Sequence, residues 1–229
     1  PALVEMGAIL VALTAAVLAA AAVVLIVLPL SRLAGKGPAP AGQRPGAPAV
    51  LGYFGAIGLG FMFLEIVWIQ RFTLFWGQPL YSAAGVLAAL LCGMGVGSAL
   101  SARIPCTPGA IRAVLSGALV MIGVLSAVLP PLTTAGLGCP EPLKWSVGLG
   151  ILFAAAVVFG LPFPLALRAV GASRPELVPW AWGVNGCLSV LAAPLAVLTA
   201  MQGGFGAVNA VAAAAYLVAF WSASLAADV

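Results

Sequence analysis

Histidine is absent from this chain of 229 residues, and charged side chains make up only 6% of it. Without histidine, the chain cannot build a bis-histidine haem site, a histidine-ligated zinc or copper site, or a histidine proton relay. Nine basic and five acidic residues are also too few to cover a soluble domain with a polar surface. These absences exclude several common redox and hydrolytic centres and an ordinary soluble fold.

Cysteine is scarce as well, and the four cysteines form no CxxC pair. They stand singly at Cys92, Cys106, Cys139 and Cys187. Such wide spacing indicates neither a metal cluster nor a disulfide framework, and small packing residues are the simpler interpretation. We therefore expect no metal, no cofactor and no catalytic residue in this chain.

Long apolar runs dominate what is present, since 64% of the residues are hydrophobic. A helix of roughly 20 residues, rising 1.5 Å per residue, crosses about 30 Å of hydrocarbon. Windows of this kind fall at approximately 6–30, 49–70, 81–102, 111–135, 146–168, 180–201 and 204–226. They are long Ala/Leu/Val runs and not the short alternating strands of a barrel. The sequence predicts an all-α polytopic transmembrane helix bundle of about seven helices.

Three regions follow from the pattern of apolar and turn-forming residues. Residues 1–33 are expected to form a first transmembrane helix that serves as a tether. Residues 34–48 are a cytoplasmic linker rich in proline and glycine, and residues 49–229 form a six-helix membrane bundle.

The basic residues are distributed unequally between the two predicted faces of the membrane. Two fall on one side, Arg71 and Lys144, and seven on the other: Arg32, Lys36, Arg44, Arg103, Arg112, Arg168 and Arg174. The positive-inside rule then places the N-terminus outside and the C-terminus inside. The expected partners are membrane lipids and other membrane or membrane-associated chains. Nucleic acid is not expected, because no basic residues cluster with aromatic residues on a soluble surface.

Glu65 carries the only formal charge between residues 51 and 70. A charge in hydrocarbon costs roughly 2.5 kcal/mol or more, so it is normally retained for a purpose. Its i+3 and i+4 neighbours, Trp68 and Ile69, offer no polar partner. We expect a partner from elsewhere in the bundle, with Asn185, Ser98, Gln78 and Arg168 as candidates. Three roles stay open: a structural hydrogen-bonding glutamic acid, a proton or cation site, and a contact to a partner domain. Together with Gln70, Asn185 and Ser98, Glu65 forms our set of buried polar residues for a proton or partner site.

Small residues recur at four-residue spacing in two neighbouring spans. One stripe consists of Gly52, Ala56 and Gly60, and the other of Ala89, Gly93, Gly97 and Ser101. In lipid, such stripes let two backbones approach closely and gain dispersion contacts. We expect these two helices to pack tightly against each other.

Pro162 and Pro164 predict a kink or break near the cytoplasmic end of the fifth span. A broken helix can expose backbone to a substrate, as in secondary transporters, although a proline near a helix end is more often benign. The expected anchors at the membrane interface are Arg71, Trp76, Trp180 and Trp182.

Four strings occur in order along the chain: GLGFMFLEIVWIQRFTLFWGQP, GVGSALSARI, GLPFPLALRAVG and VPWAWGVNGCLSVLAAPLAV. They resemble the membrane region of the bacterial polytopic spermidine-synthase-like proteins, also described as fused transporter and spermidine synthase proteins. The resemblance covers roughly residues 50 to 220 and implies a multi-pass protein of the bacterial inner membrane. The matching positions are Glu65, Gln70, Arg71, Trp180, Trp182, Gly183, Asn185 and Gly186.

In that family a soluble aminopropyltransferase-like domain accompanies such helices, which implies polyamine or decarboxylated S-adenosylmethionine chemistry for the whole protein. This chain has neither a glycine-rich phosphate loop after a strand nor the acidic residues that grip a polyamine. The leading hypothesis is therefore a non-catalytic membrane subunit that anchors or organises partner chains. The alternatives are a small-solute transporter module, either polyamine-specific or proton-coupled, and the membrane half of an aminopropyltransferase whose catalytic domain lies elsewhere.

Overall fold

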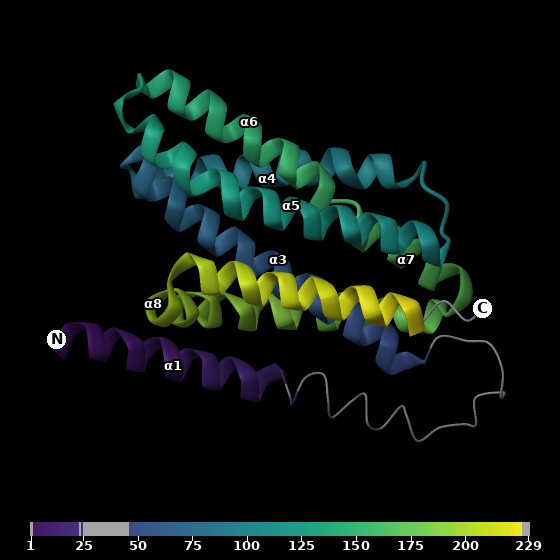
Figure 1. Ribbon diagram of the computed structural model, residues 1–229. Coiled ribbons are helices and arrows are strands. Elements are labelled where there is room, and N and C mark those ends of the chain that lie inside the picture. The colour runs from purple at the N-terminus through teal and green to yellow at the C-terminus, as the bar shows by residue number, and fades with distance from the viewer. Residues whose placement is uncertain (1, 23, 25–45, 226–229) are drawn as a thin grey trace.

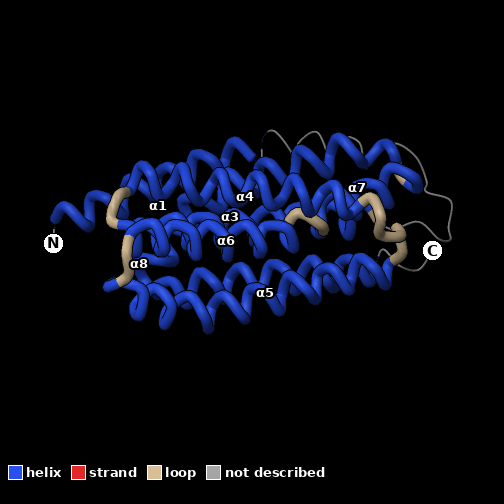
Figure 2. Tube along the Cα trace, turned by 90° about the horizontal axis from the view of Figure 1, so that it is seen from above, coloured by secondary structure: helices blue, strands red, loops and turns tan. Residues whose placement is uncertain are grey.

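The computed structural model describes residues 2–22, 24 and 46–225, and within these residues it contains helices, turns and loops but no strand. The helices lie side by side in one elongated bundle (Figures 1 and 2). The all-α prediction is thus correct for the described residues. Five helical segments are long and apolar enough to cross a membrane. The count of seven spans and the orientation of the termini stay predictions.

From α3 onward, the helices follow one another with short connections. Their bounds are α1 Ala2–Ala22, α3 Ala47–Trp76, α4 Pro79–Ser101, α5 Pro108–Ala135, α6 Glu141–Phe159, α7 Pro162–Ser173 and α8 Val178–Leu225, with short 3-10 turns at η2 Gly136–Gly138 and η3 Pro175–Leu177. Proline occupies the first or second position of α3, α4, α5, α6 and α7. Its fixed φ suits a helix start, where the missing N–H costs no hydrogen bond. Proline therefore sets most of the helix starts.

α3 is longer than the predicted span 49–70. It continues through Phe72, Phe75 and Trp76, all buried, because these aromatic side chains pack inside the bundle. The helix ends at Gly77, whose φ of 75° is left-handed and whose N–H donates to the Thr73 carbonyl. The helix thus extends six residues beyond the predicted span and ends at the Gly-Gln-Pro turn.

α8 consists of two arms that fold back on each other at Gly204, where φ is 68° and ψ is −175°. The contacts of α3 give the direction of each arm. A Cβ at Gly52 would face Ser222 and one at Gly60 would face Tyr216, so the second arm runs antiparallel to α3. Gly55 and Gly58 instead face residues 184, 185, 188 and 189 of the first arm, which runs parallel to α3. Small residues of α3 thus lie against both arms.

The stripe of α4 packs against α6, so the expected packing of the two stripes against each other is wrong. A Cβ at Gly93 would lie 2.5 Å from the Phe153 carbonyl oxygen, and one at Gly97 would overlap that of Val157. In return, a Cβ at Gly160 would lie 2.5 Å from the Met94 carbonyl oxygen. The stripe of α3 is occupied by α8, which leaves the stripe of α4 free for α6.

The described basic residues gather at one end of the bundle. Arg103, Arg112, Arg168 and Arg174 lie where α4 leads to α5 and α7 leads to α8, whereas Arg71 and Lys144 lie toward the opposite end. Arg32, Lys36 and Arg44 lie outside the described residues, as do most of the predicted linker and the last residues of the predicted first span. Four of the six described basic residues thus lie at one end of the bundle, and the orientation in the membrane stays a prediction.

Candidate functional site: a cavity beside the α6–α7 break

The helix formed by residues 141–173 is interrupted between α6 and α7. α6 ends at Phe159, and Leu161 donates its N–H to the Val158 carbonyl at 3.3 Å in a tightened last turn. α7 begins at Pro162, so the interruption comes before the two prolines. Since Pro164 has no N–H, the Gly160 carbonyl receives no i+4 helical hydrogen bond. The break leaves an accepting backbone group inside the bundle.

A cavity of about 420 Å³ lies beside this break. Four parts of the chain line it: α3, α4, the α6–α7 junction and both arms of α8. The lining residues are Ile57, Gly58, Phe61, Met94, Ser98, Phe159, Gly160, Pro162, Phe163, Pro164, Leu167, Trp182, Asn185, Ser189 and Tyr216. None of these side chains carries a formal charge. Its size and mostly apolar lining are those of a small-molecule site.

Asn185 and Ser189 form the polar side of the cavity on the first arm of α8. The Asn185 Nδ2 donates to the Phe54 carbonyl oxygen at 2.9 Å, and the Ser189 hydroxyl donates to the Asn185 carbonyl oxygen at 2.8 Å. One N–H of the Asn185 amide and the Ser189 hydroxyl are therefore directed to backbone. The Asn185 Oδ1 forms no hydrogen bond with a described residue. Ser98 contributes a hydroxyl from α4. The Asn185 Oδ1 and the oxygen of this hydroxyl can both accept hydrogen bonds from a ligand.

Aromatic rings form much of the remaining wall. Phe159 lies 6.3 Å from Phe61 and 5.6 Å from Tyr216, measured between ring centroids. Phe163 meets Trp182 edge to face at 4.6 Å. The Tyr53 hydroxyl donates to the Pro162 carbonyl oxygen at 3.0 Å and holds the start of α7 against α3. Ring faces carry partial negative charge and attract cations as well as apolar groups.

Glu65 does not line the cavity, but it lies on the same side of α3 as two residues that do. It follows Gly58 by seven residues and Phe61 by four, which places all three on one helical face. Its side chain is half-buried. Among the described residues, no hydrogen bond or ion pair involves its carboxylate. The carboxylate is therefore positioned one helical turn beyond the cavity wall.

None of the four predicted partners of Glu65 contacts its carboxylate. Asn185 bonds to the Phe54 carbonyl, Ser98 lines the cavity, and Gln78 is an exposed residue that precedes α4. The prediction failed because each of these residues lies or forms its hydrogen bonds elsewhere in the bundle. Ser98 was predicted to be buried but is exposed, because α4 buries the face that carries Gly93 and Gly97. Gln70 is half-buried and lies outside the cavity lining.

The fourth candidate, Arg168, fixes the end of α7 to the end of α4. Its guanidinium donates to the carbonyl oxygens of Ser101, Ala102 and Ile104, the last at 2.9 Å. Carbonyls at a helix C-terminus lack intrahelical donors and attract a cation. Arg168 thus ties together two of the elements that form the cavity.

The predicted interface anchors occupy different environments. Trp76 is buried, stacks on Trp145 at 4.0 Å and donates its indole N–H to the Lys144 carbonyl, so it joins α3 to α6. Its stacking partner lies 69 positions further along the chain, and its role as an interface anchor stays a prediction. The Arg71 guanidinium lies over the Phe205 ring at 5.1 Å, close to the fold of α8. Trp180 is half-buried and Trp182 is 58% exposed.

Ser189 and Phe163 are among the cavity residues that the sequence pattern did not predict. Ser189 follows Asn185 by one helical turn, and this spacing was available as a signal. Phe163 stands between two prolines in an apolar run and gave no such signal. The described residues hold no group of three metal-ligating side chains, and the four cysteines are unpaired.

Comparisons of this chain with protein-family models, curated proteins and solved structures found no match. The resemblance to spermidine-synthase-like proteins stays a prediction. The site is interpreted from its own geometry.

Proposed function

We propose that this chain is a non-catalytic integral membrane module that binds a small solute in the cavity beside the α6–α7 break and takes part in moving it across the membrane. The observation that carries the proposal is the interrupted helix itself, which borders a cavity of about 420 Å³. Irregular backbone at membrane depth is tolerated where it is enclosed by protein or lines a cavity, and secondary transporters place substrate sites at such breaks.

The lining favours a solute that donates hydrogen bonds. The Asn185 Oδ1 and the Gly160 carbonyl are acceptors without a helical or side-chain donor, whereas one N–H of Asn185 and the Ser189 hydroxyl are directed to backbone. Aromatic rings and the absence of a basic residue from the lining make the cavity suitable for an amine. Glu65, one turn beyond Phe61, supplies a negative charge on the same face. Spermidine is the first probe to use, because the sequence resemblance points to polyamine chemistry.

The test is uptake of labelled spermidine, and of a panel of small amines, into liposomes that contain the purified chain. Ser98→Phe places a large side chain in the cavity and should abolish uptake. Ser116→Phe adds the same ring at an exposed position on α5 and should leave uptake unchanged. Glu65→Gln keeps the shape of the side chain, removes its charge, and should lower uptake while the protein remains folded. Equal uptake by the wild type and Ser98→Phe would refute the transport function.

A second function, the anchoring of a partner chain, is favoured by α1. This helix packs against α8, and it leaves Met6, Ile9, Leu10, Leu13 and Val17 more than half exposed. A partner helix could cover these side chains in the membrane. Identifying every chain that copurifies with the native protein, before and after Leu10→Ser and Leu13→Ser, tests this function. Unchanged copurification of the same chains would argue against α1 as the anchor.

A further inference from the structure

A second cavity, of about 250 Å³, lies at the end of the bundle that carries four of the six described basic residues. It is enclosed by the start of α3, the segment leading into α5, the outer face of α7 and the end of α8. The lining residues are Ala49, Val50, Tyr53, Phe54, Cys106, Pro108, Ile111, Ala166, Ala169, Val170, Ala172, Ser173, Ser222 and Ala223. It shares no lining residue with the cavity beside the α6–α7 break.

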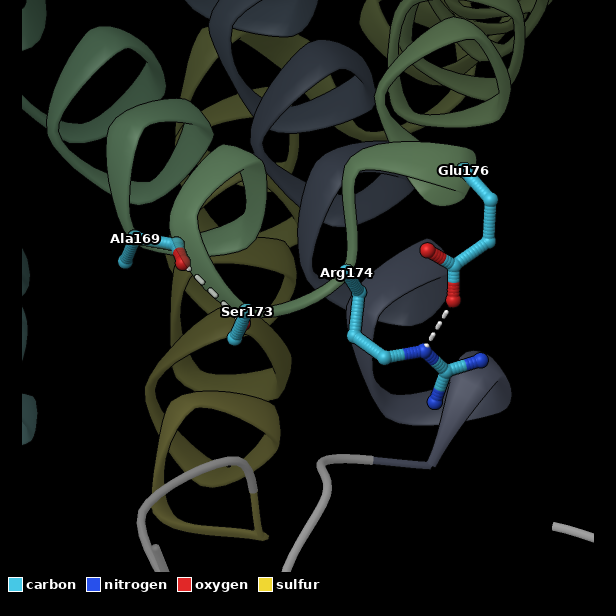
Figure 3. A network of polar contacts seen from close by, with 4 residues as sticks. All are labelled: Ala169, Ser173, Arg174 and Glu176. Carbon is cyan, nitrogen blue, oxygen red and sulfur yellow. Dashed lines mark hydrogen bonds and ion pairs between the residues drawn. The ribbon is translucent and has the colours of Figure 1, made fainter.

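The walls of this second cavity are suited to hydrocarbon. Eleven of its fourteen lining residues are alanine, valine, isoleucine, proline, phenylalanine or cysteine. The hydroxyls on the α7 and α3 walls already donate hydrogen bonds to backbone carbonyls. Ser173 donates to the Ala169 carbonyl at 3.0 Å (Figure 3), and Tyr53 donates to the Pro162 carbonyl. A polar occupant would find few free partners and would lose its hydration. The cavity therefore favours an apolar chain.

The charge beside this cavity is positive. Arg112 directly follows the lining residue Ile111, is half-buried, and has a buried Nε without a hydrogen-bond acceptor in the described part of the chain. The acidic residue described at this end, Glu176, is paired with Arg174 at 2.6 Å, as Figure 3 shows. Its carboxylate thus offsets Arg174 and leaves the charge of Arg112 uncompensated by an ion pair. A buried donor without an acceptor is uncommon, and a guanidinium in this position is suited to bind an anionic group.

We propose that this cavity binds one acyl chain of an anionic phospholipid, whose phosphate is held by Arg112. The apolar pocket suits the acyl chain of such a lipid, and the neighbouring unpaired arginine suits its phosphate. An acyl chain alone would not explain the arginine, and a phosphate alone would not explain the apolar pocket. The occupant is structural or regulatory, and this site is independent of the transport function proposed above. A result against lipid binding would therefore not count against transport, and a result against transport would not count against lipid binding.

Native mass spectrometry of the purified chain with phosphatidylglycerol and phosphatidylcholine of identical acyl chains tests the proposal. We expect phosphatidylglycerol to be retained more strongly. Arg112→Gln should weaken its binding about fivefold, the effect of one basic residue near a lipid surface. Lys144→Gln at the opposite end and Arg103→Gln in the α4–α5 connection remove the same charge and should change binding less than twofold. An equal loss in all three variants would show diffuse attraction and overturn the site.

The acyl-chain half is tested by filling the cavity. Ala169→Phe should lower retention of both phospholipids, and its thermal unfolding reports whether the variant is folded. If it does not fold, Ala172→Leu on the same wall serves instead. Soluble glycerol phosphate should not compete, since it has no acyl chain. Full competition by glycerol phosphate, or unchanged retention in a folded cavity-filled variant, would overturn the proposal.

Discussion

A side chain at Gly97 would overlap the backbone carbonyl of Val157, so α4 and α6 approach each other as closely as two helical backbones can. Gly93 and Gly160 have the same relationship to the carbonyls of Phe153 and Met94. Such contact depends on the absence of Cβ atoms, and it holds the helix that ends at the break. The packing beside the cavity is therefore sensitive to a single methyl group.

Gly97→Ala should lower the free energy of unfolding by about 1–3 kcal/mol, because a backbone carbonyl cannot move aside as a flexible side chain can. Thermal unfolding in detergent measures the loss. Gly95→Ala is the matched control in the same helix, since nothing lies within 4 Å of its added Cβ. There the higher helix propensity of alanine should leave stability unchanged or slightly raised. Equal effects at the two positions would contradict the α4–α6 packing.

Gly204→Ala should destabilise the fold of α8, because a φ of 68° with extended ψ is accessible to glycine and strained for alanine. We expect a cost of about 1–3 kcal/mol, measured by the same unfolding assay. Gly206→Ala adds a methyl group two residues later, at an open helical position. A variant at Gly204 as stable as this control would show that the two arms of α8 are joined differently.

The two asparagines of α8 should respond in opposite ways to alanine. Asn185→Ala removes the hydrogen bond to Phe54, with an expected loss of about 0.6–1.5 kcal/mol. Asn209 has a buried Oδ1 without a donor among the described residues. Asn209→Ala removes this unsatisfied acceptor and should be neutral or stabilising. Chemical or thermal unfolding of both variants tests the contrast, and a larger loss at Asn209 would contradict it.

Arg168→Gln should loosen the connection between α4 and α5. The substitution removes donors from three carbonyls at the end of α4, and because the side chain is exposed we expect a loss of only about 1 kcal/mol. Hydrogen exchange of residues 101–108 should become faster. Arg103→Gln in the same connection, where no hydrogen bond is formed by the described side chain, should leave exchange unchanged.

Two cysteines at opposite ends of the bundle test the predicted orientation. Cys106 lies between α4 and α5, and Cys139 lies between η2 and α6. With the N-terminus outside, a membrane-impermeant maleimide should label Cys139 in intact cells and Cys106 only after permeabilisation. Variants that retain one cysteine at a time make the assignment unambiguous. The opposite labelling pattern would invert the topology.

The pattern of residues in the sequence predicted where the helices lie, but it did not predict which helices contact each other. The starts of α4 and α5 agree with the apolar windows to within three residues, because proline and the turn residues before each helix are local signals. The end of α3 was misplaced by six residues, because Phe72 and Trp76 are buried by partners distant in the chain. The gap between the predicted windows 180–201 and 204–226 lies at the fold of α8, because Gly203 and Gly204 are a local turn signal.

The candidate site was predicted in part. Asn185, Ser98, Pro162 and Trp182 were selected separately and for different reasons, yet all four line one cavity. Glu65 was selected as its centre and lies outside the lining. A charge within an apolar run is conspicuous in a sequence, whereas a cavity is a property of several helices together and has no local signature.

Composition and local periodicity determined that this chain is helical, apolar and interrupted at specific glycines and prolines, because each of these properties depends on neighbouring residues and on the solvent around them. Tertiary structure alone decided that the stripe of α4 meets α6, that α3 lies against both arms of α8, and that Trp76 is buried. Apolar helices with small-residue stripes are nearly equivalent partners for one another in lipid. Which helices pack together is decided by how well their whole surfaces fit, because two helices cannot occupy the same position in the bundle.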